Sequence, residues 1–511
     1  MPDKTKIEVT DFDPAGISPI YDELAPSWEM NRDFAEMHLH ILRGGAYLDT
    51  FGDKIKEADA SYAWRAQASF AMDHCADLIN LRVDNLFRSP PVREYEKSPH
   101  KKFIEGFLAD VDGGGTSMDA FMRRALVAYY VNGVDIVVDK AAPPGGAVAN
   151  TRADEQSLEL MPYLHAFGPL ERLDWACDHG GSYLWARYDL GQDPDPDERG
   201  GGSGAHKYLT MLRREWRLYE VRSEGEGDQE KRTILMSSGP IALGACPVVP
   251  LYFKTSGRAD YPQVPLSLLT RIAPIARYML NLLSQSQLDL YASVAFFALL
   301  GIEEKDAPDT ISPMTIWCLP GEHAAVQQLG REIGPIKEKR EWLAMLMEAI
   351  LRIGKLTGGT GDLESRASSG VQVAVERTDL DNEMRMTAGQ AEDAERRIVQ
   401  FAVSRWQGKF IEADAIGYGV EYNRKYVLTP VTELIKQARE FFGIGVHDEV
   451  QGLAKILLGK ILDASLSDQD ARYNEALEEI KAATLDGLAG AEPVGESEGR
   501  TQSGEPEIEE E

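Results

Sequence analysis

The sequence is poor in cysteine and in long hydrophobic runs. Its 511 residues include four widely spaced cysteines with no CxxC motif: Cys75, Cys177, Cys246 and Cys318. This pattern excludes a disulfide-rich secreted scaffold; spacing alone leaves a metal site open, but buried free thiols are the favoured interpretation. The longest nearly uninterrupted apolar run, Val294 to Ile302, is far shorter than the roughly 20 residues that cross a bilayer. We therefore expect no membrane anchor.

Positive charge is also scarce. Lysine and arginine total 54 against 83 aspartate and glutamate residues, which gives a formal net charge of −29. Tight coating of nucleic acid needs a surplus of cations to neutralise phosphates, so this balance argues against it. The N-terminal sequence MPDKTKIEVTDFD carries acids where a signal peptide would need an apolar stretch. We therefore expect a soluble protein that is not exported by a recognisable signal.

The motifs of common enzyme classes are missing or misplaced. Gly354-Lys355-Leu356 and Gly459-Lys460-Ile461 lack the serine or threonine that completes a nucleotide-binding phosphate loop. The sequence contains no HExxH zinc motif. Its one GxSxG sequence, at 495–499, lies in a polar acidic tail with no strand before it. A strained nucleophile elbow cannot form there.

Two smaller groups of side chains offer weaker alternatives. His38 and His40 could supply half of a metal site, but alternate residues point to different sides of a helix, so we interpret them as surface or core histidines. Asp135 and Asp139 share one face of a short predicted strand and are the best acids for an enzymatic site. No nucleophile or base accompanies them at usable spacing. We therefore predict a protein without catalytic activity, cofactor or bound metal.

Hydrophobic periodicity predicts a mainly helical α+β protein with the length of two to four domains. Long helices are expected at Tyr62–Phe87, Ser117–Tyr130, Leu266–Leu290, Gly334–Lys355 and Gln372–Gln407, with further helices in 429–484. Strands are expected at 133–139, 183–188, 207–220, 233–236, 248–253 and 417–428. Most of them should form an antiparallel sheet packed on the earlier helices, with hairpin tips at 193–204 and 223–228.

The helices at 266–290 and 334–355 form a matched pair around a small mixed module, which has strand-like pieces at 294–299 and 315–319. Apolar residues nearly encircle the second helix, which indicates contacts on more than one side. That helix also carries a basic set: Lys337, Lys339, Arg340, Arg352 and Lys355. Two interpretations stay open for this set. It is either a solvated face paired with neighbouring acids or a sparse basic lining along a channel for a polyanion.

A glycine-rich and hydroxyl-rich segment, Thr357 to Gly370, follows the second helix. A mobile loop is the favoured interpretation, because a phosphate cradle would have to follow a strand. The C-terminal segment 485–511 holds nine acids against the single base Arg500 and few large apolar residues. Such a composition cannot offset the entropy of ordering, so we predict a disordered acidic tail.

The order of these parts resembles that of the portal proteins of tailed double-stranded DNA bacteriophages, over roughly residues 20 to 484. Four pieces of sequence look like one subgroup of portals. They are Trp28-Glu-Met-Asn-Arg-Asp33, Gly44-Gly45-Ala-Tyr-Leu48, Asn132-Gly133-Val-Asp-Ile-Val-Val-Asp139 and Pro247-Val-Val-Pro250. None of them is a catalytic signature; their order carries the resemblance.

The resemblance implies a portal-like fold with these regions: a wing at 1–261, a first stem helix at 262–290, a clip at 291–333, a second stem helix at 334–356, a tunnel loop at 357–371, a long helix and strand returning to the wing at 372–428, and a crown at 429–484. The tunnel-loop residues would be Gly358, Gly359, Gly361, Leu363, Arg366 and Gly370. Glycine gives such a loop the backbone freedom to move as DNA passes.

The family also implies partners. Portal proteins form a homo-oligomeric ring, usually of twelve subunits, at one capsid vertex. Double-stranded DNA passes through it, and the ring contacts the major capsid protein and scaffold, the terminase large subunit and later a head-completion or adaptor protein. The resemblance therefore implies a place in the virion, reached from the host cytoplasm during assembly. The alternative is a non-viral oligomeric interaction scaffold without catalytic activity.

Overall fold

The computed structural model describes residues 7–8, 12–37, 46–50, 59–140, 160–192, 205–223, 231–257, 262–295, 297–300, 325–328, 334–355, 370–424, 476 and 478. The chain divides into two units, Met1–Tyr426 and Val427–Glu511, and the description below concerns the first. Several predictions fall outside the described residues: the acidic tail, the crown apart from Ala476 and Glu478, the tunnel loop apart from Gly370 and Val371, the hairpin tips at 193–204 and 224–228, His38, His40 and Cys318.

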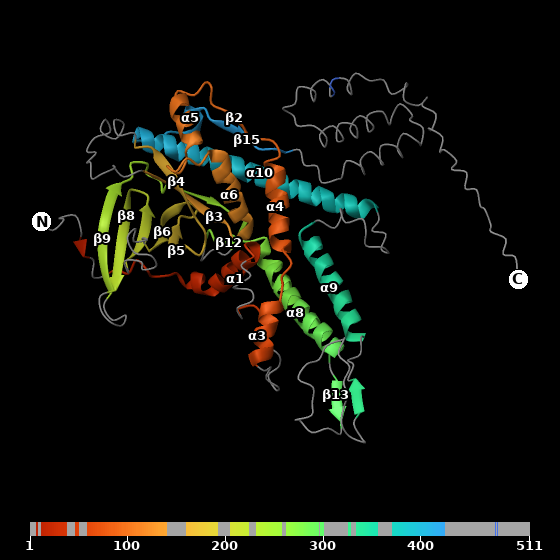
Figure 1. The fold of residues 1–511 in the computed structure, drawn as a ribbon. Coiled ribbons are helices and arrows are strands. Elements are labelled where there is room, and N and C mark those ends of the chain that lie inside the picture. Colours follow the sequence, from red (N-terminus) through yellow and green to blue (C-terminus); the bar gives the residue numbers. More distant parts are fainter. Residues whose placement is uncertain are drawn as a thin grey trace, which may run out of the picture. The chain divides into compact units, whose positions relative to one another are not determined.

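Among the described residues, five helices precede the first long strand (Figure 1): α1 (Pro19–Ala35), α3 (Asp59–Ala68), α4 (His74–Leu86), α5 (Lys101–Ala109) and α6 (Met118–Val131). The predicted helix at 117–130 is confirmed, and Ser117 caps it by accepting a hydrogen bond from the Ala120 N–H at 3.3 Å. The single helix predicted at 62–87 is wrong, because residues 69–73 separate α3 from α4. Asp73 accepts the Ala76 N–H at 3.3 Å and starts a new helix there.

A six-stranded antiparallel sheet has the strand order β1-β9-β8-β7-β6-β5. Its strands are β1 (Ile7–Glu8), β5 (Arg172–Cys177), β6 (Tyr183–Gln192), β7 (Ala205–Leu212), β8 (Glu215–Ser223) and β9 (Lys231–Pro240). The predicted antiparallel sheet is confirmed, but the single strand at 207–220 is wrong. β7 and β8 form a hairpin that turns at Arg213 and Arg214. Neither glycine nor proline marks this turn, so the sequence pattern runs through it.

A second sheet has the order β10-β3-β4 and confirms the strand predicted at 133–139. Its members are β3 (Val134–Lys140), β4 (Pro162–Phe167) and β10 (Val248–Leu251). Two short ladders complete the body: β11 (Lys254–Thr255) pairs with β12 (Pro265–Leu266), and β2 (Val92–Glu94) pairs with β15 (Gly419–Glu421). The strand predicted at 417–428 therefore shrinks to three described residues, because 422–424 leave the ladder and 425–428 lie outside the description.

One hydrophobic core joins both sheets to helices from distant parts of the chain. Ile20 of α1, Val137 of β3, Tyr188 of β6 and Leu209 of β7 are buried in the same cluster, and Phe401 packs against it. Phe401 belongs to α10 (Gly370–Gln407), which also contacts β3, β4 and β10. The body is therefore a mixture of helix and sheet, as expected from the sequence.

The matched helix pair is present. A 3-10 turn, η2 (Leu269–Arg271), leads into α8 (Ala273–Ala295), and α9 (Gly334–Ile353) packs against α8 (Figure 1). An apolar stripe at helical spacing along the first predicted helix is buried: Leu269, Ile272, Ala276, Leu280 and Leu283. Between the helices, β13 (Phe297–Leu300) pairs with β14 (Ala325–Gln328), so the strand predicted at 294–299 starts later, and 315–319 is not described. Among the described residues, no helix combines the length and apolarity needed to cross a membrane.

The helix α10 confirms the long helix predicted at 372–407. Its 38 residues correspond to a length of about 57 Å. A short helix, α11 (Ala413–Ile416), follows and leads into β15. Through these elements the last part of the unit returns to the N-terminal helices, because β15 pairs with β2.

The described cysteines are free thiols. Cys75 and Cys246 are buried and Cys177 is half-buried. Burial raises the pKa of the Cys75 and Cys177 thiols to about 12, so they stay protonated and unreactive near neutral pH. The prediction of buried free thiols is confirmed for Cys75 and Cys246.

Gly133 connects α6 to β3 and has no room for a side chain. Its φ is +85°, and a Cβ there would lie 2.6 Å from Cδ1 of Tyr252. We expect Gly133→Ala to lower the free energy of unfolding by about 2 to 3 kcal/mol, through strain and overpacking. Gly389 in α10 is the matched control, because nothing lies within 4 Å of its Cβ position. Gly389→Ala should stabilise by up to about 1 kcal/mol. Urea unfolding measures both, and equal effects of the two variants would contradict this assignment.

Candidate functional site

The sequence pieces that carry the portal resemblance meet in the structure. Tyr47 donates its hydroxyl to Asp33 at 2.6 Å, which links the second piece to the first. Asn132, which opens the third piece, accepts a hydrogen bond from Asn31 at 2.9 Å and donates one to the Trp28 carbonyl at 2.7 Å. All five residues are buried. These pieces are therefore structural: they fix α1 against the end of α6.

The fourth piece joins the same region through a sheet. Val248 and Pro250 of β10 pair with Val137 and Asp135 of β3 in antiparallel register. The third and fourth pieces are thus neighbouring strands, and they lead towards η2 and α8. The order of motifs that suggested a portal corresponds to one connected packing unit.

Polar contacts anchor the first half of α8 to this unit. Asn281 accepts the Asp49 N–H at 2.7 Å and donates to the Tyr47 carbonyl at 2.9 Å. Arg65 of α3 is buried and donates to the Ser284 hydroxyl at 3.1 Å and to the Asp49 carbonyl at 2.6 Å. Because buried polar groups are costly to leave unpaired, these contacts fix the direction in which α8 leaves the body.

The helix α9 has distinct sides. At roughly 100° per residue, the exposed Lys337, Arg340 and Arg352 share one face, whereas the half-buried Lys339 lies on the side of buried Ile350. The predicted basic set is therefore divided rather than continuous. The large apolar side chains of Trp342 and Met345 are 52% and 51% exposed. Because apolar residues nearly encircle α9, some of them stay exposed among the described residues.

Lys355, the last member of the predicted basic set, follows α9 and forms an ion pair. Its Nζ lies 2.9 Å from Oε2 of Glu383 on α10, and it also donates to the Asp379 carbonyl at 3.4 Å. Arg82 of α4 approaches the other carboxylate oxygen of Glu383, with Nε 3.2 Å from Oε1. The end of α9 is thus joined to both α4 and α10 through one carboxylate.

The backbone at the end of α9 is also fixed by hydrogen bonds and close packing. Arg82 donates to the Gly354 carbonyl at 2.6 Å and to the Leu78 carbonyl at 2.9 Å. A Cβ on Gly354 would lie 2.6 Å from Cδ2 of Leu78, so only glycine fits. Lys355 adopts a φ of +57°, the left-handed conformation that ends many helices. The end of α9 is therefore fixed in position as far as Lys355.

Sequence reasoning missed Arg82 and Glu383. A usable signal was present for the acid: Glu383 directly precedes Met384, the first residue of the predicted apolar stripe of the long helix, and it is itself buried. A carboxylate on a buried face needs a cationic partner. The sequence could not show which arginine supplies it, because the partner is 301 residues away. Of the predicted tunnel-loop residues, the described Gly370 is the first residue of α10.

The acids of β3 have structural partners rather than catalytic ones. Asp135 is buried and accepts hydrogen bonds from Tyr183 at 3.1 Å, from Tyr188 at 3.0 Å and from Tyr252, and Arg172 approaches it at 3.4 Å. Burial raises the pKa of the Tyr183, Tyr188 and Tyr252 hydroxyls well above their usual value. These phenols therefore stay protonated as donors and hold the two sheets together.

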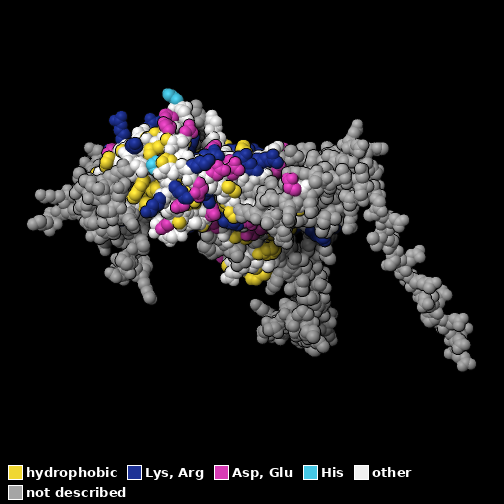
Figure 2. Space-filling view, turned by 90° about the horizontal axis from the view of Figure 1, so that it is seen from above, with side chains coloured by type: hydrophobic (Ala, Val, Ile, Leu, Met, Phe, Trp, Pro, Cys, Tyr) yellow, Lys and Arg dark blue, Asp and Glu magenta, His cyan; other side chains and the backbone are white. Residues whose placement is uncertain are grey.

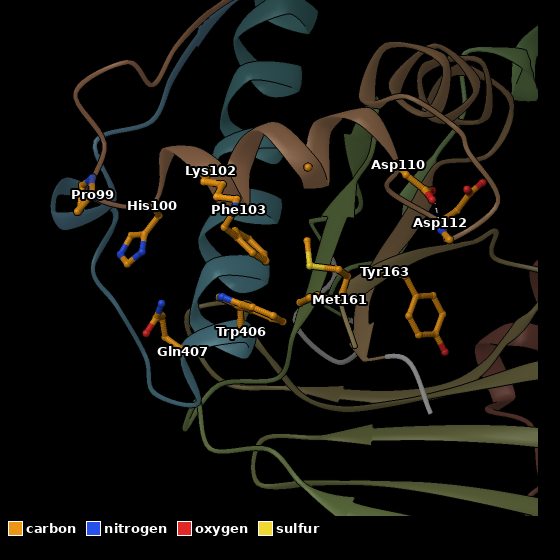
Figure 3. Close-up of a pocket in the computed structure, with 13 residues that line it drawn as sticks. Pro99, His100, Lys102, Phe103, Asp110, Asp112, Met161, Tyr163, Trp406 and Gln407 are labelled. Atoms are coloured by element: carbon orange, nitrogen blue, oxygen red, sulfur yellow. Dashed lines mark hydrogen bonds between the residues drawn. The ribbon is translucent and has the colours of Figure 1, made fainter. Parts of the chain in front are cut away.

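Asp139 is hydrogen-bonded to a residue that lines a cavity but does not line the cavity itself. It accepts from Arg405 at 2.9 Å and from Tyr163 at 3.3 Å. Tyr163 lines a cavity of about 1060 Å³ between α5, the end of α10 and β4 (Figure 3). Phe103 and Trp406 stack along it with ring centroids 5.4 Å apart. The wall mixes aromatic side chains with polar and charged ones, and neither Asp135 nor Asp139 lines it.

Two acids lie at one end of this cavity, in the turn after α5. Asp110 accepts the Gly113 N–H at 2.8 Å, and Asp112 accepts the Gly114 N–H at 2.9 Å. Hydrogen bonds from Thr116 and Gly114 lower the pKa of Asp112 to about 2. Within the described ranges, no group of three or more His, Cys, Asp or Glu side chains could hold a metal ion. These acids shape the turn.

The two cations around Glu383 should differ in their effect on stability. We expect Arg82→Met to lower the free energy of unfolding by about 3 to 5 kcal/mol, because it leaves a buried carboxylate without its buried partner. Lys355→Met should cost at most about 1 kcal/mol, since its side chain is 36% exposed. Urea unfolding of both variants measures the difference. Similar losses would show that Lys355 and Arg82 contribute alike.

Comparisons with known proteins give no match to any family model and none to any curated protein. Among solved structures, the chain is similar to one from the neck of an empty gene transfer agent particle, computed with C6 symmetry. That match has a TM-score of 0.36 and 11% identity, and covers 78% of this chain and 94% of the other. A chain from the virion of the native gene transfer agent particle matches with a TM-score of 0.35, 10% identity, and coverage of 78% and 93%.

Proposed function

We propose that this chain is the subunit of a portal ring, which forms the DNA channel at one vertex of a tailed phage or phage-like particle. The observation that carries the proposal is the arrangement of α8 and α9. Each helix is buried near the end that meets the body, as at Leu280 of α8 and Ile350 of α9. The rest of α9, over residues 337–349, is largely exposed. A strand pair lies between them in the chain, and α10 returns to the body. The stem helices, the clip and the returning helix of a portal subunit follow one another along the chain in this same order.

Exposed apolar side chains on this pair support an oligomer. Trp342 and Met345 of α9 and Tyr278 of α8 are each about half exposed. Apolar surface of this kind on a helix is characteristic of an interaction site. In a closed ring, one subunit covers what its neighbour exposes. Twelve subunits are the number implied by the family resemblance.

The charge distribution supports a conduit rather than a tight DNA-binding protein. Each phosphate that a protein neutralises adds affinity, and a ring that grips DNA would obstruct its passage. Exposed arginines along α10 pair with acids, for example Arg385 with Asp381 at 3.0 Å and Arg396 with Asp393 at 3.2 Å. Figure 2 shows Lys and Arg side chains next to Asp and Glu on the face seen from above. Such a surface offers DNA few unpaired cations.

The remaining roles follow from the same proposal. The β13–β14 region would be part of the clip, which receives the terminase large subunit and later the adaptor protein. The body would be the wing, facing the major capsid protein and scaffold. The protein would act without catalysis or cofactor, in the virion and, during assembly, in the host cytoplasm.

The oligomeric state tests the proposal directly. We expect native mass spectrometry of the purified full-length chain to give a ring of about twelve subunits, and electron microscopy to show a central opening. The reason is that the exposed α8–α9 surface is covered only when neighbours close around an axis. A monomer or dimer at high concentration, without an opening, would contradict the ring and favour the non-viral scaffold.

A substitution on α9 tests whether the pair forms the interface. We expect Trp342→Glu to weaken each subunit contact by about 2 kcal/mol, roughly 30-fold in association constant. The reason is that it removes a large apolar side chain that the neighbouring subunit would cover. Unfolding of the single subunit should be unchanged, since Trp342 is 52% exposed in it. Phe410→Glu is the control, because Phe410 is 41% exposed and lies beyond the end of α10. Analytical ultracentrifugation over a concentration series measures both. Equal weakening would show that α9 is not the interface.

A further inference from the structure

The carboxylate of Glu383 is shared by two cations that differ in accessibility. The Arg82 side chain is fully buried and lies 3.2 Å from Oε1. The Lys355 side chain is 36% exposed and lies 2.9 Å from Oε2. Arg82 compensates Glu383 whether or not Lys355 stays. The ammonium of Lys355 can therefore leave without stranding an unpaired buried charge.

The backbone that carries Lys355 does not have to move when the side chain does. The Gly354 N–H donates to the Ile350 carbonyl at 2.8 Å, and the Lys355 N–H donates to the Arg352 carbonyl at 3.1 Å. Arg82 holds the Gly354 carbonyl at 2.6 Å. The root of the side chain is thus fixed, and its four-carbon stem alone is free to turn. Lysine suits such an exchange, because its ammonium is a compact hydrated charge with no fixed geometry.

We infer that Lys355 is a phosphate-contacting residue that exchanges partners: it leaves Glu383 for a backbone phosphate of passing DNA and returns when that phosphate moves on. The inference rests on the proposed function, in which α8 and α9 belong to the ring that forms the DNA channel. Glu383 is then a built-in competitor that keeps each phosphate contact brief. Arg82 is a positioning residue, which holds Glu383 and the Gly354 backbone in place during the exchange.

If this exchange occurs, removing Lys355 and removing Glu383 should change DNA binding in opposite directions. Lys355→Met removes one phosphate contact from every subunit that touches the duplex, so the slope of log affinity against log salt should become shallower by about 0.9 for each such contact. Glu383→Gln removes the competitor, so DNA affinity should rise at least threefold at low salt. In the double variant the effect of Glu383→Gln should disappear, since there is no ammonium left to release.

The experiment measures binding of a short linear duplex to assembled full-length rings by fluorescence anisotropy, over a series of salt concentrations. Lys409→Met is the charge-matched control, because Lys409 is exposed and lies beyond the end of α10. It should keep the wild-type slope. Sedimentation first confirms that each variant assembles. If Glu383→Gln does not assemble, the comparison of Lys355→Met with Lys409→Met decides alone.

The outcomes separate this inference from the proposed function. A wild-type slope for Lys355→Met, or an effect of Glu383→Gln that persists in the double variant, overturns the exchange while leaving the portal assignment intact. Wild-type protein that forms no ring, or rings that bind no duplex at any salt concentration, overturns the proposed function and this inference with it.

Discussion

Buried carboxylates on α10 must be matched by cations from elsewhere in the chain, and this requirement shapes the whole unit. Glu383 takes Arg82 from α4, and Glu395 takes Arg93 from β2 at 2.6 Å. Glu392 takes Arg424, which follows β15, at 2.6 Å. Removing one partner of such a pair is costly, because the remaining charge stays in a medium of low polarity. The acids of α10 therefore specify which segments surround it.

The same requirement explains how the base of the α8–α9 pair is fixed. At the base, Arg65 and Arg82 tie the helices to the body through buried hydrogen bonds. Along α9, by contrast, the Trp342 side chain is about half exposed among the described residues. The direction of the two helices is thus set by polar contacts at one end, whereas apolar side chains along α9 stay accessible.

Local signals predicted much of this fold. The helices at 117–130 and 372–407 could be predicted because each depends on neighbours in sequence. The helix break before Asp73 and the turn at Arg213 were missed, since apolar periodicity continued through both and no glycine or proline marked them. The partner of Glu383 could not be predicted, because side-chain pairing across 301 residues leaves no local pattern.

The four sequence pieces behind the resemblance also show what a sequence alone does not reveal. They were noted for their order, and the structure shows that Asp33 and Asn31 of α1 form buried hydrogen bonds with Tyr47 and Asn132 respectively. These residues contribute to packing. Their order in the sequence did not reveal these contacts, because each bond joins residues that are not neighbours in the chain.

The long separation between α10 and its partners has a consequence for biosynthesis. A ribosome that has released only the N-terminal half of the chain has produced Arg82 and Arg93 but neither of the glutamates that neutralise them. Contacts of such high sequence separation form late and slowly. The body can close only when nearly all of residues 1–424 have emerged, so a product truncated before Glu383 lacks the acids that neutralise Arg82 and Arg93.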